Sequence, residues 1–68
     1  MKPDKYLETY LNYCIEYWYK KNNRKIPFGI LYNIDSVLQK SYGSFISKSI
    51  SDEEMKLRLR QYMESKMN

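Results

Sequence analysis

The first third of the chain carries apolar residues at helical spacing. Neither Gly nor Pro interrupts residues 4–22. Four apolar residues follow the spacing i, i+4, i+7 and i+11, which places them on one face of a helix. This stripe consists of Leu7, Leu11, Cys14 and Trp18. The pattern predicts a helix over residues 4–22 whose apolar stripe faces the core.

A row of four tyrosines runs beside that stripe: Tyr6, Tyr10, Tyr13 and Tyr17. A tyrosine combines a large apolar ring with a hydroxyl that needs a partner, so such rows are typical of cores and interfaces. A 68-residue chain has little further protein to cover the row once the neighbouring stripe is buried. The row therefore predicts an interface, in the simplest case a homodimer, since two-fold homodimers are the commonest oligomers. A platform on which single-stranded bases stack is the alternative.

A second helix is predicted over residues 27–42. Pro27 suits the first position of a helix, where its missing N–H needs no partner. Apolar residues then recur on one helical face: Ile30, Leu31, Ile34, Val37, Leu38 and Tyr42. Gly43 stands where a C-terminal cap is expected, so we expect this helix to end at Tyr42.

The last third of the chain predicts a third helix over residues 51–66. Ser51 suits the N-cap, and Glu54 stands where it completes a capping box and pairs with Arg58 one turn on. The inward stripe of this helix consists of Met55, Leu59, Tyr62 and Met63. Residues 44–50, before it, fit either a short fourth helical turn or a packed loop.

These segments predict an all-α fold, a single small three-helix domain over residues 1–68. A chain of this length forms one domain, and no period-2 alternation indicates a strand. The expected core consists of Leu7, Leu11, Cys14, Trp18, Ile30, Ile34, Val37, Leu38, Phe45, Ile46, Leu59 and Met63.

The net charge of +4 is concentrated in one short segment. Residues 20–25 hold four bases and no acid, whereas the other eight bases balance the eight acids of the chain. The four bases are Lys20, Lys21, Arg24 and Lys25. Bases at the end of a helix complement its dipole, but these also precede the positive start of the next helix, which favours a phosphate.

The sequence therefore predicts a small nucleic-acid-binding regulatory or accessory protein that contacts phosphates through this basic segment. The alternative is a protein-interaction module, a small regulator or inhibitor that docks on a larger protein through the tyrosine row.

The residue types present argue against an enzyme. The chain has no histidine, one cysteine and two glycines, which excludes Ser-His and Cys-His pairs, His-containing metal sites and glycine-rich phosphate loops. Asp52, Glu53 and Glu54 are explained as capping residues, and Cys14 lies on the core stripe. We therefore expect no catalytic residue, no cofactor and no metal.

The sequence also indicates where the protein resides. The longest stretch without Asp, Glu, Lys or Arg, residues 26–34, is far shorter than the roughly 20 residues that span a membrane. The single cysteine forms no internal disulfide, which favours a reducing, cytoplasmic location.

Overall fold

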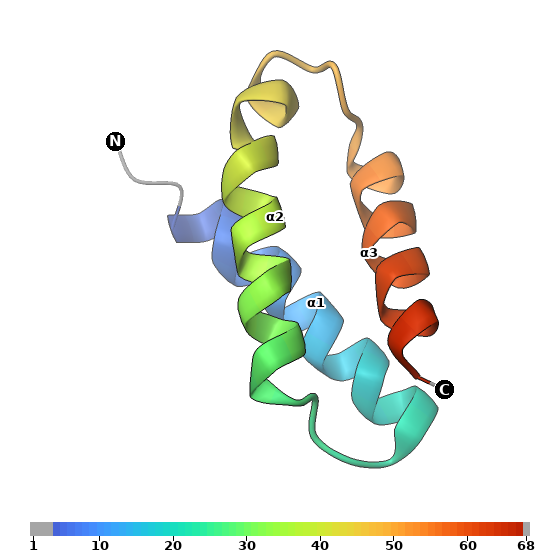
Figure 1. The fold of residues 1–68 in the computed structure, drawn as a ribbon. Coiled ribbons are helices and arrows are strands. Elements are labelled where there is room, and N and C mark those ends of the chain that lie inside the picture. Colours follow the sequence, from blue (N-terminus) through green and yellow to red (C-terminus); the bar gives the residue numbers. More distant parts are fainter. Residues whose placement is uncertain (1–3, 68) are drawn as a thin grey trace.

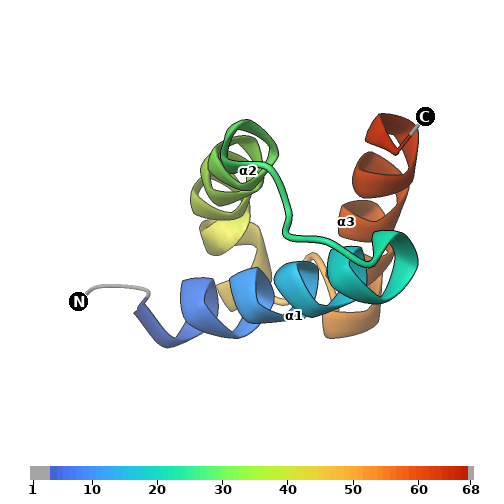
Figure 2. The same cartoon turned by 90° about the horizontal axis from the view of Figure 1, so that it is seen from below.

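The computed structural model describes residues 4–67, which form three α-helices joined by two loops. The helices are α1 (Asp4–Asn22), α2 (Phe28–Ile46) and α3 (Asp52–Lys66). Figures 1 and 2 show that α1 lies across one face of the pair formed by α2 and α3. No strand occurs in residues 4–67, so the predicted all-α, three-helix fold is confirmed.

The observed bounds of α1 match the predicted ones. The helix ends because Asn23 adopts a left-handed conformation with φ 57°, and its N–H donates to the Tyr19 carbonyl at 2.7 Å. Asparagine tolerates this conformation better than most residues and therefore suits the end of a helix.

The second helix is longer than predicted. It continues through Gly43 to Ile46, and the left-handed residue that follows it is Lys48, with φ 66°. The prediction that Gly43 caps the helix is therefore wrong, and so is the predicted end at Tyr42. The extra turn places Phe45 against the Tyr6 ring, with ring centres 5.0 Å apart. This aromatic packing outweighs the roughly 1 kcal/mol by which glycine disfavours a helix interior.

The third helix begins as the capping pattern predicts. The Ser51 hydroxyl accepts a hydrogen bond from the Glu54 N–H at 3.1 Å. The Glu54 carboxylate pairs with Arg58 Nε at 3.1 Å and does not close the capping box. Residues 44–46 belong to α2, and the chain between Ile46 and Asp52 is a loop.

The core lies where the three helices meet. Its buried side chains are Tyr6, Tyr10, Cys14, Trp18, Ile34, Leu38, Met55, Leu59 and Met63. Four further predicted core residues pack against this cluster while partly buried: Leu7, Leu11, Ile30 and Phe45.

Two predicted core residues lie outside the core. Val37 is 43% exposed and Ile46 is 58% exposed. Successive helical residues differ by about 100° in direction, and the buried stripe of α2 is centred on Ile34 and Leu38. Val37 and Ile46 therefore point away from that stripe.

Candidate functional site

Half of the tyrosine row is part of the core. Tyr10 is 3% exposed, and Tyr6 packs its ring edge-on against Tyr10 and Tyr42 at 5.2 and 5.1 Å between ring centres. The expectation that one chain cannot cover this row is therefore wrong for Tyr6 and Tyr10, which α2 and α3 cover. The homodimer through the row stays a prediction, and only Tyr13 and Tyr17 are partly exposed for such a contact.

A polar stripe on α3 supplies partners for the tyrosine hydroxyls. The Tyr10 hydroxyl donates to the Asp52 carboxylate, and the Tyr17 hydroxyl donates to the Glu64 carboxylate. The Tyr13 hydroxyl accepts a hydrogen bond from the Arg60 guanidinium at 2.8 Å. The hydroxyls of Tyr10, Tyr13 and Tyr17 thus bind α1 to α3.

These contacts shift the pKa values of the groups involved. Burial, followed by the hydrogen bond to Asp52, raises the pKa of Tyr10, and the same bond lowers the pKa of Asp52. The hydrogen bond to Glu64 raises the pKa of Tyr17 to about 12. At neutral pH both tyrosines are therefore neutral hydrogen-bond donors, and the Asp52 carboxylate is charged.

The sequence carries a signal for this contact that the tyrosine row alone does not reveal. Charged residues recur every four positions along α3: Asp52, Lys56, Arg60 and Glu64. This spacing places them on one helical face, and the tyrosines of α1, which are three or four positions apart, likewise share one face of their helix. A row of charged residues on one helix and a row of hydroxyls on another indicate that these two faces bind each other.

Three helix ends converge at the basic end of the bundle. The last turn of α1, the loop before α2 and the end of α3 lie together at the lower end of Figure 1. Lys20 and Lys21 belong to that turn, Arg24 and Lys25 to the loop, and Lys66 to the end of α3. The sequence prediction included the first four residues and missed Lys66, which is 41 residues from Lys25.

A cavity of about 410 Å³ lies between these three ends. It is lined by Trp18, Asn22, Arg24, Lys25, Pro27, Ile30, Lys66 and Met67. The predicted basic cluster therefore divides into two pairs, because Arg24 and Lys25 line this cavity and Lys20 and Lys21 do not. Lys21 Nζ lies 5.6 Å from the centre of the Tyr17 ring, and Lys20 lines a shallow hollow beside Tyr17.

The start of α2 adds positive potential to the same end. The Leu31 N–H is the first to bond within the helix, to the Pro27 carbonyl at 3.1 Å. The N–H groups of Phe28, Gly29 and Ile30 precede it and have no partner inside the helix. No side chain caps them, so the positive end of the helix dipole adjoins Arg24 and Lys25.

Two exposed aromatic rings come shortly after the basic segment in the sequence. Phe28, the first residue of α2, is 78% exposed, and Tyr32 one turn later is 64% exposed. Their ring centres are 6.4 Å apart. Sequence reasoning missed this pair because neither residue belongs to the conspicuous tyrosine row.

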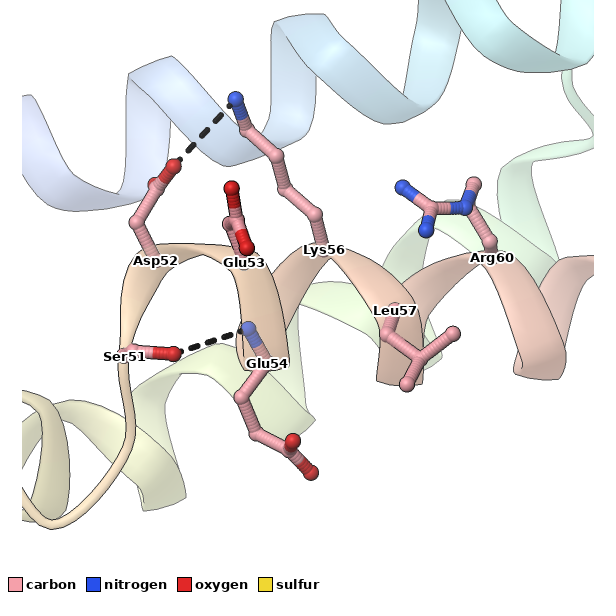
Figure 3. Close-up of a pocket in the computed structure, with 7 residues that line it drawn as sticks. All are labelled: Ser51, Asp52, Glu53, Glu54, Lys56, Leu57 and Arg60. Atoms are coloured by element: carbon pink, nitrogen blue, oxygen red, sulfur yellow. Dashed lines mark hydrogen bonds and ion pairs between the residues drawn. The ribbon is translucent and has the colours of Figure 1, made fainter.

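The first turn of α3, at the opposite end of the bundle, carries three acidic residues, and two of them have structural partners. Figure 3 shows the residues that line an open hollow at the start of α3, where Asp52 lies 3.4 Å from Lys56 Nζ and Ser51 caps Glu54. Asp52 also accepts from Tyr10. Asp52 is thus a bridging residue, and the Glu54 carboxylate pairs with Arg58.

The remaining chemical groups of residues 4–67 offer little for catalysis. Cys14 is fully buried, and burial raises the pKa of its thiol to about 12, so it is protonated at neutral pH. No group of three or more Cys, Asp or Glu side chains in this part of the chain is placed to hold a metal ion. None of the three described helices combines the length and apolar character needed to cross a membrane.

Comparison with known proteins gives no relative for this arrangement. No family model, curated protein or solved structure matches the chain.

Proposed function

We propose that this protein is a small, non-enzymatic nucleic-acid-binding regulatory or accessory protein whose basic end contacts phosphates. The observation that carries the proposal is the meeting of exposed bases from three helix ends beside the uncapped start of α2. They are Lys20, Lys21, Arg24, Lys25 and Lys66. Both ion pairs found within residues 4–67 lie on α3, and neither includes one of these bases. Their charges therefore remain available to an external anion.

Single strands are the form of nucleic acid that this surface favours. Phe28 and Tyr32 are exposed at the start of α2, close in sequence to Arg24 and Lys25. Bases of a single strand stack on exposed aromatic side chains while neighbouring cations bind the backbone. The contacts to phosphate carry no sequence information by themselves, so we expect weak sequence preference.

A titration at several salt concentrations tests this proposal. Fluorescently labelled single-stranded DNA, single-stranded RNA and duplex DNA are titrated with the protein between low and moderate salt. Affinity should fall steeply with salt, and changing Lys20, Lys21, Arg24 and Lys25 to Ala should flatten the log–log slope. Each lost contact to a single strand reduces that slope by about 0.7.

A charge control separates this site from general attraction. The double variant Lys5→Ala with Lys40→Ala removes two exposed bases outside the basic end. Per charge removed, it should change the slope far less than the quadruple variant does. If the parent protein binds no nucleic acid at low salt, the proposal is wrong, and protein docking through the exposed rings of Phe28 and Tyr32 takes its place.

A further inference from the structure

A buried hydrogen-bond donor without a partner adjoins the basic end. Trp18 lines the cavity between the three helix ends, and its side chain is almost fully buried, with 5% of the residue exposed. Its indole Nε1 has no hydrogen-bond partner among residues 4–67. A buried polar group without a partner is disfavoured, so an acceptor that reaches this N–H is bound favourably.

The groups that share the cavity with Trp18 define the kind of acceptor. Arg24, Lys25 and Lys66 line the same cavity and bring positive charge. Pro27 and Ile30 line it too, so the first turn of α2 and its unpartnered backbone N–H groups adjoin it. No Asp or Glu side chain is among the lining residues. Cations, N–H donors and the absence of acids in the lining favour an oxyanion with several acceptor oxygens.

We propose that this cavity binds one phosphate group, which accepts a hydrogen bond from the Trp18 indole N–H and is held by Arg24, Lys25 and Lys66. The inference deepens the function proposed above by making one backbone or terminal phosphate of the nucleic acid the occupant. The cavity volume of about 410 Å³ is ample for such a group, since a water molecule takes about 30 Å³ in the liquid.

Binding requires a small rearrangement of the cavity wall. Nε1 is covered from water in the structure, so the atoms that cover it must move before a phosphate oxygen reaches it. The exposed Arg24 and Lys25 lie in the loop after α1, outside any helix, and can move without disrupting a helical hydrogen bond. Backbone signals of residues 23–28 should therefore respond together with the indole signal.

The single tryptophan of the chain makes the test direct. In a two-dimensional ¹H–¹⁵N NMR spectrum the Trp18 indole N–H gives one separate signal. Inorganic phosphate is added at constant ionic strength, with sodium chloride as the reference anion. The indole signal should move in a saturable manner with phosphate and not with chloride.

Two charge-matched double variants separate the cavity from general charge. Arg24→Ala with Lys25→Ala removes two bases that line the cavity, and Lys20→Ala with Lys21→Ala removes two that do not. The first double variant should weaken phosphate binding at least tenfold, because each of the two bases that it removes makes a charge-assisted contact with the phosphate. The second pair should weaken it less than threefold. Equal effects of the two pairs would overturn the proposed site.

Removal of the donor itself is a further test. Trp18→Phe keeps an aromatic ring in the core and deletes the N–H, and phosphate binding is then followed through the amide signals of residues 23–28. Binding should weaken several-fold. If this variant fails to fold, Lys66→Ala tests the cavity through another contact: Lys66 is exposed and lines the cavity, so its loss should weaken phosphate binding several-fold while the indole signal remains as the probe.

The outcomes for the phosphate site and for the proposed function are distinguishable. An oligonucleotide with a 5′-phosphate, the same oligonucleotide without it, and inorganic phosphate are compared. If both oligonucleotides move the indole signal, a backbone phosphate occupies the cavity; if only the phosphorylated one does, the terminal phosphate does. If inorganic phosphate moves it and neither oligonucleotide binds, the phosphate site stands and the nucleic-acid function fails. Salt-dependent oligonucleotide binding that leaves the indole signal unmoved overturns the phosphate site alone.

Discussion

The hydrogen bond between Tyr10 and Asp52 should stabilise the contact between α1 and α3 measurably. Tyr10→Phe removes the hydroxyl and keeps the buried ring in place. A hydrogen bond to a charged group contributes about 1.5–3 kcal/mol. The Asp52 side chain is 56% exposed, so water replaces part of the lost bond. We therefore expect a loss of about 1.5 kcal/mol, or roughly 6–12 °C in Tm for a domain of this size.

The pH dependence of this loss identifies the carboxylate as the partner. The bond lowers the pKa of Asp52 in the folded protein. Its contribution is therefore fully present above the unfolded value of about 3.9 and is lost as the pH falls through the lowered folded value. The stability difference between the parent and Tyr10→Phe should thus be constant from pH 5 to 7 and shrink below about pH 4.

Urea denaturation followed by circular dichroism at pH 7 and pH 2.5 measures both effects. Tyr13→Phe is the matched control, because Tyr13 accepts from Arg60, which stays charged throughout this range. Its effect on stability should show no such acid dependence. A Tyr10→Phe protein as stable as the parent at pH 7, or a loss of equal size at pH 2.5, would refute the reasoning.

Three further changes test the packing of α1 and α2. Leu38→Ala should lower the free energy of unfolding by about 2–5 kcal/mol, because Leu38 is fully buried. The neighbouring Val37 is exposed, so Val37→Ala should change that free energy by no more than about 0.5 kcal/mol. Urea titration compares the two variants. Gly43→Ala should stabilise the protein by about 1 kcal/mol, since Gly43 lies inside α2 with open space around it; a loss of stability in thermal unfolding would contradict the continuous helix. The Cys14 thiol, which is buried and has a raised pKa, should react with Ellman's reagent only in denaturant, and a fast reaction of the native protein would contradict its burial.

The predicted elements follow the structure where a local signal fixes them. The Ser51 cap is a contact between residues three apart, and the stripe of α1 depends only on helical period, so both are visible in the sequence. The end of α2 is not visible in the sequence. Gly43 is a local signal for a helix cap, but the packing of Phe45 on Tyr6 overrides it. That packing joins residues 39 positions apart, which no short pattern reveals.

The candidate site shows the same division between local and long-range information. The basic segment is contiguous and therefore conspicuous in the sequence. Lys66 reaches the same cavity only through the return of α3 to the end of α1. The unpartnered N–H of Trp18 cannot be read from the sequence either, because an apolar stripe predicts that the ring is buried but not that its N–H lacks a partner.

Helix dipoles explain some of the bases at this end and leave others unexplained. Lys20, Lys21 and Lys66 lie in the last turns of α1 and α3, where positive charge stabilises a helix. Arg24 and Lys25 lie beside the positive start of α2, where the dipole of α2 disfavours positive charge.

Without an anion, changing Arg24 and Lys25 to Ala should therefore leave the protein at least as stable as the parent at low salt. Saturating phosphate should reverse this order, because a ligand at 100 times its Kd stabilises the folded state by about 2.7 kcal/mol. Urea denaturation of both proteins with and without phosphate measures the reversal. If the variant is the less stable protein under both conditions, Arg24 and Lys25 stabilise the fold itself and are not explained by an external anion.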